Sequence, residues 1–432
     1  MKFYSTNNKS HTVSLEEAVV RGLAPDGGLY MPETITPFSV EYFETLPQKS
    51  FQQIGFEVAK QLLGNDLPAD VLQRIVNHTI TFDAPLVQLE PNIFSLELFH
   101  GPTLAFKDFG ARFMSQLLGH FAQKSNRKVT ILVATSGDTG SAVANGFLDV
   151  PNTKVVVLYP SGKVSDIQEK QFTTLGKNST ALEVDGTFDD CQRMVKQAFG
   201  DDALHQKLFL TSANSINIAR LIPQSFYYFY AWSRLKDRSN VVVSIPSGNF
   251  GNLTAGLLAK RLGLPIQHFI ASTNANDIIP VYLTSKQYDP RPSIATISNA
   301  MDVGNPSNFA RMLDLYNNDW NRLSADITGY TFSDDETQAQ MRDTFQKHSY
   351  ILDPHGAVGL LGLKKYLAQN TSKTGFFLET AHPAKFKEVV DETLGSPIST
   401  PEKLKSFVAG TKRSILLNAD FNDLKKWLMQ LA

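Results

Sequence analysis

Hydrophobic residues follow one pattern before about residue 90 of the chain and a different pattern after it. In the first part, apolar residues recur at helical spacing, for example at Ile54, Val58 and Leu62. Side chains three or four positions apart lie on the same face of a helix, so this spacing predicts helices that bury one face. We therefore expect a helical N-terminal domain over residues 1–90.

After residue 90, short runs rich in valine and isoleucine lead into turns, several of them rich in glycine, and then into a helical pattern. This alternation is typical of a parallel β-sheet with helices on both faces. The predicted strands are residues 129–134, 154–158, 241–245, 266–272 and 375–380. Ligands of such sheets bind at the carboxyl ends of the strands, where the glycine-rich turns stand.

An aromatic stretch at residues 226–232 is apolar nearly all round and predicts a buried helix. We place this helix between two α/β subdomains. The smaller subdomain is expected over residues 91–225 and the larger one over residues 226–432. The predicted fold class is therefore α/β, with two parallel-sheet subdomains and a helical N-terminal unit.

Charge and composition limit the partners that the chain can have. Its 432 residues include 41 basic and 42 acidic side chains, for a net charge of −1, with no cationic run suited to nucleic acid or an anionic membrane. No apolar run reaches the roughly 18 residues that span a bilayer, and the first residues lack a signal-peptide pattern. We expect a cytoplasmic protein, a monomer or a homodimer, with neither nucleic-acid nor membrane partners.

The chain offers few residues for a metal site or a disulfide. Its single cysteine, Cys191, excludes both a disulfide within one chain and a thiolate zinc site. The histidines His100, His355 and His382 are not at metal-ligand spacing. We therefore expect no metal ion.

One lysine, Lys107, stands among the bulky apolar residues Leu104, Phe106 and Phe109. Burial disfavours an ammonium group, so these neighbours favour the neutral amine, which can attack an aldehyde and form a Schiff base. A lone lysine in this setting is also typical of a surface helix start. Two glycine-rich turns elsewhere in the chain favour the reactive interpretation.

Both turns are suited to anions. Residues 247–252, Ser-Gly-Asn-Phe-Gly-Asn, stand between a strand and a helix, where backbone N–H groups converge on a group such as a cofactor phosphate. Residues 135–140, Thr-Ser-Gly-Asp-Thr-Gly, follow an earlier strand and could hold a carboxylate or simply cap a helix. A reactive lysine, a phosphate loop and a carboxylate loop are what pyridoxal phosphate chemistry on an amino acid requires.

Four segments then resemble one enzyme family in sequence and order: residues 99–109, 135–140, 247–252 and 379–383. They are similar to the threonine synthases, a pyridoxal-phosphate-dependent family with the tryptophan-synthase-β-like fold, also called fold type II. Residues 23–32 resemble its longer bacterial and fungal branch. The resemblance implies pyridoxal 5'-phosphate as cofactor and conversion of O-phospho-L-homoserine and water into L-threonine and phosphate.

The resemblance also implies roles for individual residues. Lys107 would form the Schiff base, and Thr380 would contact the pyridine nitrogen. The implied cofactor-phosphate residues are Gly248, Asn249, Phe250, Gly251 and Asn252. The implied substrate-carboxylate residues are Ser136, Gly137, Asp138 and Thr139.

The leaving phosphate of the implied substrate needs a cation. The candidates are Arg220 together with Asn217, Lys163, and Arg112. We favour Arg220, because a cation on a buried helix requires a ligand or a partner acid; a structural ion pair is the alternative.

Two other functions are compatible with the same motifs. A phospho-lyase on this scaffold would release 2-oxobutyrate and ammonia, and it would differ only in whether water is positioned at Cβ. A non-catalytic binding protein could also retain the fold.

Overall fold

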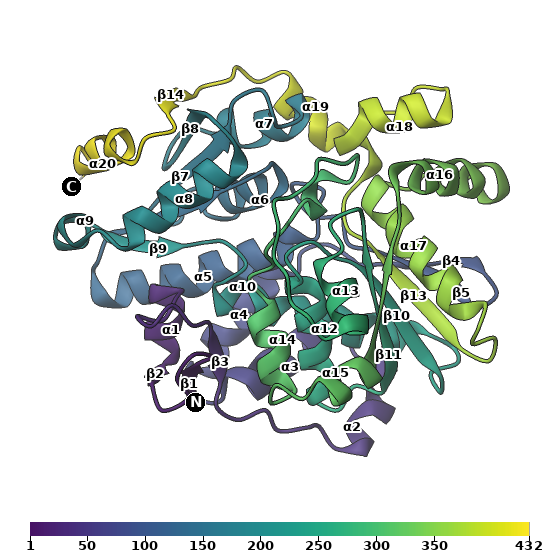
Figure 1. The fold of residues 1–432 in the computed structure, drawn as a ribbon. Coiled ribbons are helices and arrows are strands. Elements are labelled where there is room, and N and C mark those ends of the chain that lie inside the picture. Colours follow the sequence, from purple (N-terminus) through teal and green to yellow (C-terminus); the bar gives the residue numbers. More distant parts are fainter. Residues whose placement is uncertain (432) are drawn as a thin grey trace.

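The strands of the protein form three sheets in a computed structural model that describes residues 1–431 (Figure 1). A six-stranded sheet has the order β12-β11-β10-β13-β5-β4, and a five-stranded sheet has the order β14-β8-β7-β6-β9. Within these two sheets every pairing is parallel except that of β4 with β5. We call the larger sheet with its helices the larger unit and the other the smaller unit.

The larger unit contains the strands predicted from the last valine-rich runs. Its strands are β4 (Leu86–Glu90), β5 (Ile93–Glu97), β10 (Val241–Pro246), β11 (Ile266–Thr273), β12 (Ile327–Thr331) and β13 (Thr374–Glu379). Its helices are α12 (Gly251–Arg261), α13 (Ile278–Ser285), α14 (Phe309–Leu315), α15 (Trp320–Asp326), α16 (Asp334–His348), α17 (Pro354–Leu367) and α18 (Lys387–Leu394), with short 3-10 turns η3 (Asn299–Met301) and η4 (Pro383–Phe386). Every residue of β10 is buried, and α17 packs against this strand.

The smaller unit begins with the helix that carries Lys107. Its strands are β6 (Val129–Ala134), β7 (Thr153–Pro160), β8 (Ser179–Asp185), β9 (Phe209–Ser212) and β14 (Ile415–Asn418). Its helices are α5 (Lys107–Ser125), α6 (Asp138–Gly146), α7 (Asp166–Thr173), α8 (Phe188–Phe199), α9 (Asp202–Lys207), α19 (Glu402–Val408) and α20 (Phe421–Met429). The predicted α/β fold class is confirmed.

The N-terminal region is helical as predicted, but it also contains a small sheet. Its helices are α1 (Leu15–Arg21), α2 (Val40–Thr45), η1 (Leu46–Gln48), α3 (Phe51–Leu63) and α4 (Ala69–Thr79). Three short strands pair antiparallel: β1 (Lys2–Ser5), β2 (Thr12–Ser14) and β3 (Tyr30–Pro32). Strands of three or four residues are too short for an alternating pattern to show, which is why the sequence predicted only helices here.

A buried segment joins the two units, as the aromatic stretch predicted. It consists of α10 (Ile218–Leu221), η2 (Ile222–Ser225) and α11 (Phe226–Arg234). Phe226, Tyr227, Tyr228 and Phe229 are fully buried, and α11 packs against α3 and α12. This packing fixes α10, and the arginine that it carries, between the two sheets.

Strand pairing crosses the expected subdomain boundary at residue 225 twice. Strand β5 lies in the range assigned to the smaller subdomain but pairs with β13 of the larger sheet. Strand β14 lies in the range assigned to the larger subdomain but pairs with β8 of the smaller sheet (Figure 1). The division of the chain at residues 90 and 225 stays a prediction, because pairing does not show which parts fold independently.

Candidate active site

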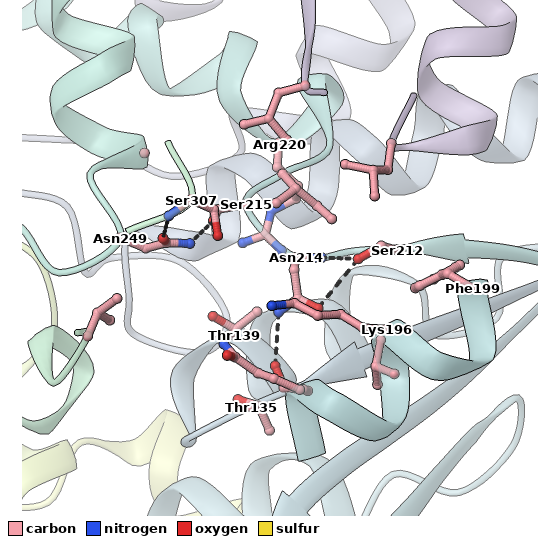
Figure 2. A pocket seen from close by; sticks show the side chains of 18 of the residues that line it. Thr135, Thr139, Lys196, Phe199, Ser212, Asn214, Ser215, Arg220, Asn249 and Ser307 are labelled. Carbon is pink, nitrogen blue, oxygen red and sulfur yellow. Dashed lines mark hydrogen bonds between the residues drawn. The ribbon is translucent and has the colours of Figure 1, made fainter. Parts of the chain in front are cut away.

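A cavity of about 1590 Å³ is lined by residues of both units. The turn after β6, the turn after β10 and Thr380 directly after β13 all contribute to its wall. Figure 2 shows Thr135, Asn214, Ser215, Arg220 and Asn249 around it. The cavity therefore lies at the carboxyl ends of parallel strands, where the sequence predicted a ligand site.

Lys107, the first residue of α5, lines this cavity, and 16% of its side chain is exposed. The segment before it is tied to the end of β13, since Phe106 N–H donates to Thr380 O at 2.9 Å and His382 N–H donates to Leu104 O at 3.0 Å. Burial lowers the pKa of Lys107. The carboxylate of Asp138 opposes this shift, whereas nearby cations add to it.

The Asp138 carboxylate lies close to the amine ends of two lysine side chains, at different distances. Its Oδ1 accepts hydrogen bonds from Lys385 Nζ at 2.7 Å and Gln168 Nε2 at 2.8 Å, while its Oδ2 is 3.7 Å from Lys107 Nζ. Burial acts to raise the pKa of Asp138, but the neighbouring lysines, Lys385 more than Lys107, outweigh it and hold that pKa below its usual range. Asp138 is therefore an anion throughout the physiological range.

Lys385 was missed by the sequence analysis, although a signal for it exists. It stands between Ala384 and Phe386, directly after the family segment that ends at Pro383, and apolar neighbours of this kind singled out Lys107. Its side chain is fully buried, and its Nζ also donates to Thr103 O at 2.8 Å.

The predicted phosphate loop lines the cavity from residue 248 to residue 252. Phe250 has a φ of 57°, in the left-handed region, and a Cβ on Gly248 would lie 2.6 Å from Met301 Cα. Within residues 1–431, the backbone N–H groups of 248–251 donate to no protein acceptor. Unpaired backbone donors at the start of α12 fit an anion.

Two asparagines of this loop have different environments. Asn252 braces the loop from within, since its Oδ1 accepts from Ser247 Oγ and its Nδ2 donates to Pro246 O, both at 2.8 Å. Asn249 joins the loop to Ser215 Oγ and to the N–H of Ser307, each at 2.5 Å (Figure 2). The sequence did not predict that Ser215 would stand beside this loop.

The predicted carboxylate loop is shaped by Thr135, whose Oγ1 accepts the N–H groups of Gly137 at 2.9 Å and Gly140 at 2.8 Å. Ser136, Asp138 and Thr139 line the cavity, and their N–H groups have no acceptor among the described residues. Gly137 does not line the cavity. A Cβ there would lie 2.6 Å from the Gln168 amide.

Arg220 lines the cavity and is only 3% exposed. Its Nη1 donates to Ala213 O, its Nε has no partner, and no carboxylate in the described part of the chain forms an ion pair with it. Burial lowers the pKa of Arg220 to about 10, and Asp108 opposes this shift from a longer range. A buried guanidinium without a partner acid is costly, so its position favours an anionic ligand.

Asn217 does not line the cavity, although its backbone carbonyl accepts the N–H of Arg220 at 3.0 Å. Its side chain caps α10 by accepting from Ala219 N–H at 3.0 Å, and its Nδ2 donates to Val19 O at 2.9 Å. Of the other two cations, Arg112 donates to Thr79 O and Thr81 Oγ1, and Lys163 is exposed. Neither of them lines the cavity.

We expect Asn217→Ala to lower the free energy of unfolding by about 2 kcal/mol, because it removes a helix cap and leaves Val19 O unpaired. Urea denaturation measures this change. The KM for substrate should stay within twofold of the wild-type value, whereas a rise of KM with unchanged stability would place Asn217 against the substrate.

Thr380 follows β13 and lines the cavity, with buried carboxyl groups behind it. Glu379 Oε1 accepts from Asp353 N–H at 2.7 Å, and Glu379 Oε2 has no partner. Burial and the Asp353 carboxylate raise the pKa of Glu379 well above its usual value, which favours the protonated carboxyl. Asp353 in turn binds His355 Nδ1 at 2.5 Å, which orients this cavity-lining imidazole.

Three family descriptions together match nearly the whole chain. "Threonine synthase N terminus" matches residues 2–80, "Pyridoxal-phosphate dependent enzyme" matches residues 79–376, and "Threonine synthase, C-terminal" matches residues 356–428. The chain belongs to the threonine synthase family. It is an enzyme dependent on pyridoxal phosphate, so the family, cofactor and enzyme class predicted from the sequence are confirmed.

Individual threonine synthases are similar over their full length. That of Haemophilus influenzae is 46% identical over 434 residues, which is 100% of both chains. The crystal structure of threonine synthase from Escherichia coli superposes with a TM-score of 0.94 at 44% identity and 100% coverage of both chains. The pyridoxal-phosphate-bound threonine synthase of Brucella melitensis gives 0.92 at 34% identity, covering 100% of this chain and 99% of that one.

Residues 1–431 contain neither a candidate membrane span nor a candidate metal cluster. None of their helices has the length and apolar character needed to cross a membrane. No group of three or more histidine, cysteine, aspartate or glutamate side chains in this part of the chain is arranged to hold a metal ion.

Proposed function

We propose that this threonine synthase family member converts O-phospho-L-homoserine and water into L-threonine and phosphate. One observation carries the proposal beyond family membership: a single cavity joins the Lys107 amine to three separate places suited to anions. They are the N–H groups of 248–251, the N–H groups at the start of α6, and the Arg220 guanidinium. The reaction brings three anions into the cavity, one for each of these places: the cofactor phosphate, the substrate carboxylate and the substrate phosphate.

Pyridoxal phosphate fits these residues. When bound, it supplies an aldehyde for an amine and an electron sink that stabilises negative charge at the substrate's α-carbon. We assign its phosphate to Gly248, Asn249, Phe250 and Gly251, with Asn252 bracing that loop. We assign its ring nitrogen to the Thr380 hydroxyl, which, unlike a carboxylate, does not hold that nitrogen protonated.

The substrate's two anions go to opposite parts of the cavity in this proposal. Its carboxylate takes the unpaired N–H groups of Ser136, Asp138 and Thr139, at the positive end of α6. Gly137 shapes the turn, since its N–H already bonds Thr135. Arg220 holds the phosphate as it leaves, and Asn217 fixes the start of the helix that carries Arg220.

Lys107 moves the protons. Burial lowers the pKa of Lys107 and so favours its neutral amine. Its Nζ can take up protons from the α- and β-carbons and return them to the γ- and α-carbons, while phosphate leaves from the γ-carbon and takes the proton of the water whose hydroxyl adds at the β-carbon. Cavity walls from both units surround this amine. One residue thus serves as base and then as acid.

Proton NMR of the products formed from O-phospho-L-homoserine by the purified holoenzyme tests the proposal. We expect L-threonine and an equal amount of phosphate. 2-Oxobutyrate in place of threonine would make the protein a phospho-lyase with the same cofactor. Absence of any product, together with failure to bind pyridoxal phosphate, would favour a non-catalytic protein.

We also propose that the enzyme works in the cytoplasm as a monomer or a homodimer, without nucleic-acid partners. The nearly balanced charge and the single cysteine support this. Cys191 is fully buried, and burial raises its pKa to about 12, so it is an unreactive thiol. Sedimentation velocity with and without added DNA measures both the assembly and the absence of binding.

A further inference from the structure

A second buried lysine stands close to the reactive one. Lys385, in η4, has a side chain of zero exposure, and its Nζ lies 2.7 Å from Asp138 Oδ1. Lys107 Nζ lies 3.7 Å from the other oxygen of the same carboxylate. One buried anion is therefore shared by two amines, and only Lys385 is at hydrogen-bonding distance.

The carboxylate is fixed on the side of Lys385. Gln168 Nε2 donates to the same oxygen at 2.8 Å, so both strong donors to Asp138 converge on Oδ1. Thr103 O anchors Lys385 Nζ from another direction at 2.8 Å. Lys107 is therefore the nearest donor to Asp138 Oδ2, at 3.7 Å. The bonds to Oδ1 keep the Asp138 carboxylate from rotating closer to Lys107.

The charges of this group balance only when one amine is neutral. Two ammonium groups beside one carboxylate leave a surplus positive charge in a place shielded from water, which is unfavourable. Lys107 borders the cavity and lacks a short bond to the carboxylate, so Lys107 is the amine that gives up its proton. Arg220 adds positive charge from α10 and strengthens this preference.

We propose that Lys385 is a positioning residue: by occupying Asp138 it prevents an ion pair between Asp138 and Lys107 and so keeps the Lys107 amine neutral and reactive. The inference rests on the proposed function, in which Lys107 bonds the cofactor. The effect of Lys385 on the Lys107 amine, however, does not require the cofactor and can be measured in the cofactor-free protein.

The test is the pH dependence of Lys107 labelling by acetic anhydride in the cofactor-free protein, followed by mass spectrometry of the peptide that contains residue 107. In Lys385→Met, the freed Asp138 pairs with Lys107, and we expect the labelling midpoint to move up by about one pH unit or more. The exposed Lys163 is labelled in the same sample, and its midpoint should stay unchanged.

A double variant separates this role from a structural one. In Lys385→Met/Asp138→Asn, both the competing Lys385 ammonium and the Asp138 carboxylate are removed. The pH midpoint of Lys107 labelling should therefore return to the wild-type value or fall below it. A merely structural Lys385 would lower the melting temperature and leave the midpoint of Lys107 in place. An unchanged midpoint in folded Lys385→Met overturns the proposal.

A second substitution covers the case in which methionine prevents folding. Lys385→Gln keeps a donor to Asp138 without the positive charge, and an upward shift smaller than that expected for methionine supports the proposal, whereas no shift overturns it. Borohydride reduction of the wild-type holoenzyme reports separately on the proposed function. Cofactor bonded to a lysine other than Lys107 would refute that function, whatever the labelling shows.

Discussion

Replacing Lys107 with alanine lowers the turnover of O-phospho-L-homoserine by a factor of about 10⁴ or more, because the variant loses both the amine that bonds the cofactor and the acid–base group at the α- and γ-carbons. The fold should survive. Lys107 is the first residue of α5. The nearest carboxylate oxygen to its Nζ is Asp138 Oδ2 at 3.7 Å, which is beyond hydrogen-bonding distance. Removing it leaves Asp138 paired with Lys385.

The measurement has two parts, turnover and covalent attachment. After borohydride reduction, the wild-type protein should carry one cofactor on the peptide with residue 107, and Lys107→Ala should carry none. Lys163→Ala is the matched control, since that exposed lysine lies outside the cavity and its loss should change neither quantity. Turnover above a tenth of the wild-type rate in Lys107→Ala would remove this residue from the reaction.

The strands predicted from the sequence are mostly or completely buried. Every residue of β6 and of β10 is buried, so each reads in the sequence as a continuous apolar run. Strands β12 and β14 stand at the edges of their sheets, with mostly half-buried and mostly exposed residues, respectively. An edge strand has no distinctive hydrophobic pattern, and only its pairing with a distant segment makes it a strand.

The site could be predicted where local chain geometry defines it. Glycines in a turn between a strand and a helix create an anion-binding loop from neighbouring residues, so residues 135–140 and 247–252 were visible in the sequence. The direction of a buried side chain depends on distant partners. Asn217 turns to Val19 in the N-terminal region, and Lys385 meets Asp138 across nearly 250 positions. Neither contact has a local signal.

Arg220→Met should lower kcat/KM for O-phospho-L-homoserine by about 10³-fold, the loss expected when one partner of a desolvated charge pair is removed. Methionine retains much of the volume of the arginine stem. Because no carboxylate pairs with Arg220 in the described structure, its removal leaves no buried anion uncompensated. The cofactor-free variant should therefore unfold at the same temperature as the wild-type protein or at a higher one.

The sign of that stability effect follows from the pKa of Arg220. Burial lowers it from its usual value to about 10, which means that the folded state binds this proton less tightly than the unfolded state. The charged group therefore destabilises the fold at every pH below about 10, and the penalty fades as the pH rises through that value. Since the charge of Arg220 does not stabilise the fold, we infer that this arginine serves to bind an anionic ligand.

A phosphate-free probe shows which anion Arg220 holds. L-2-Aminobutyrate has the substrate's amino and carboxylate groups but no phosphate, and its binding can be followed by the absorbance of the holoenzyme. Its affinity should be the same in Arg220→Met and in the wild-type enzyme, while competitive inhibition by inorganic phosphate should weaken. Arg220→Lys should recover only part of the lost kcat/KM, because an ammonium cannot bind phosphate through two parallel bonds. Equal losses for L-2-aminobutyrate and for O-phospho-L-homoserine would instead place the carboxylate at Arg220 and move the leaving phosphate elsewhere in the cavity.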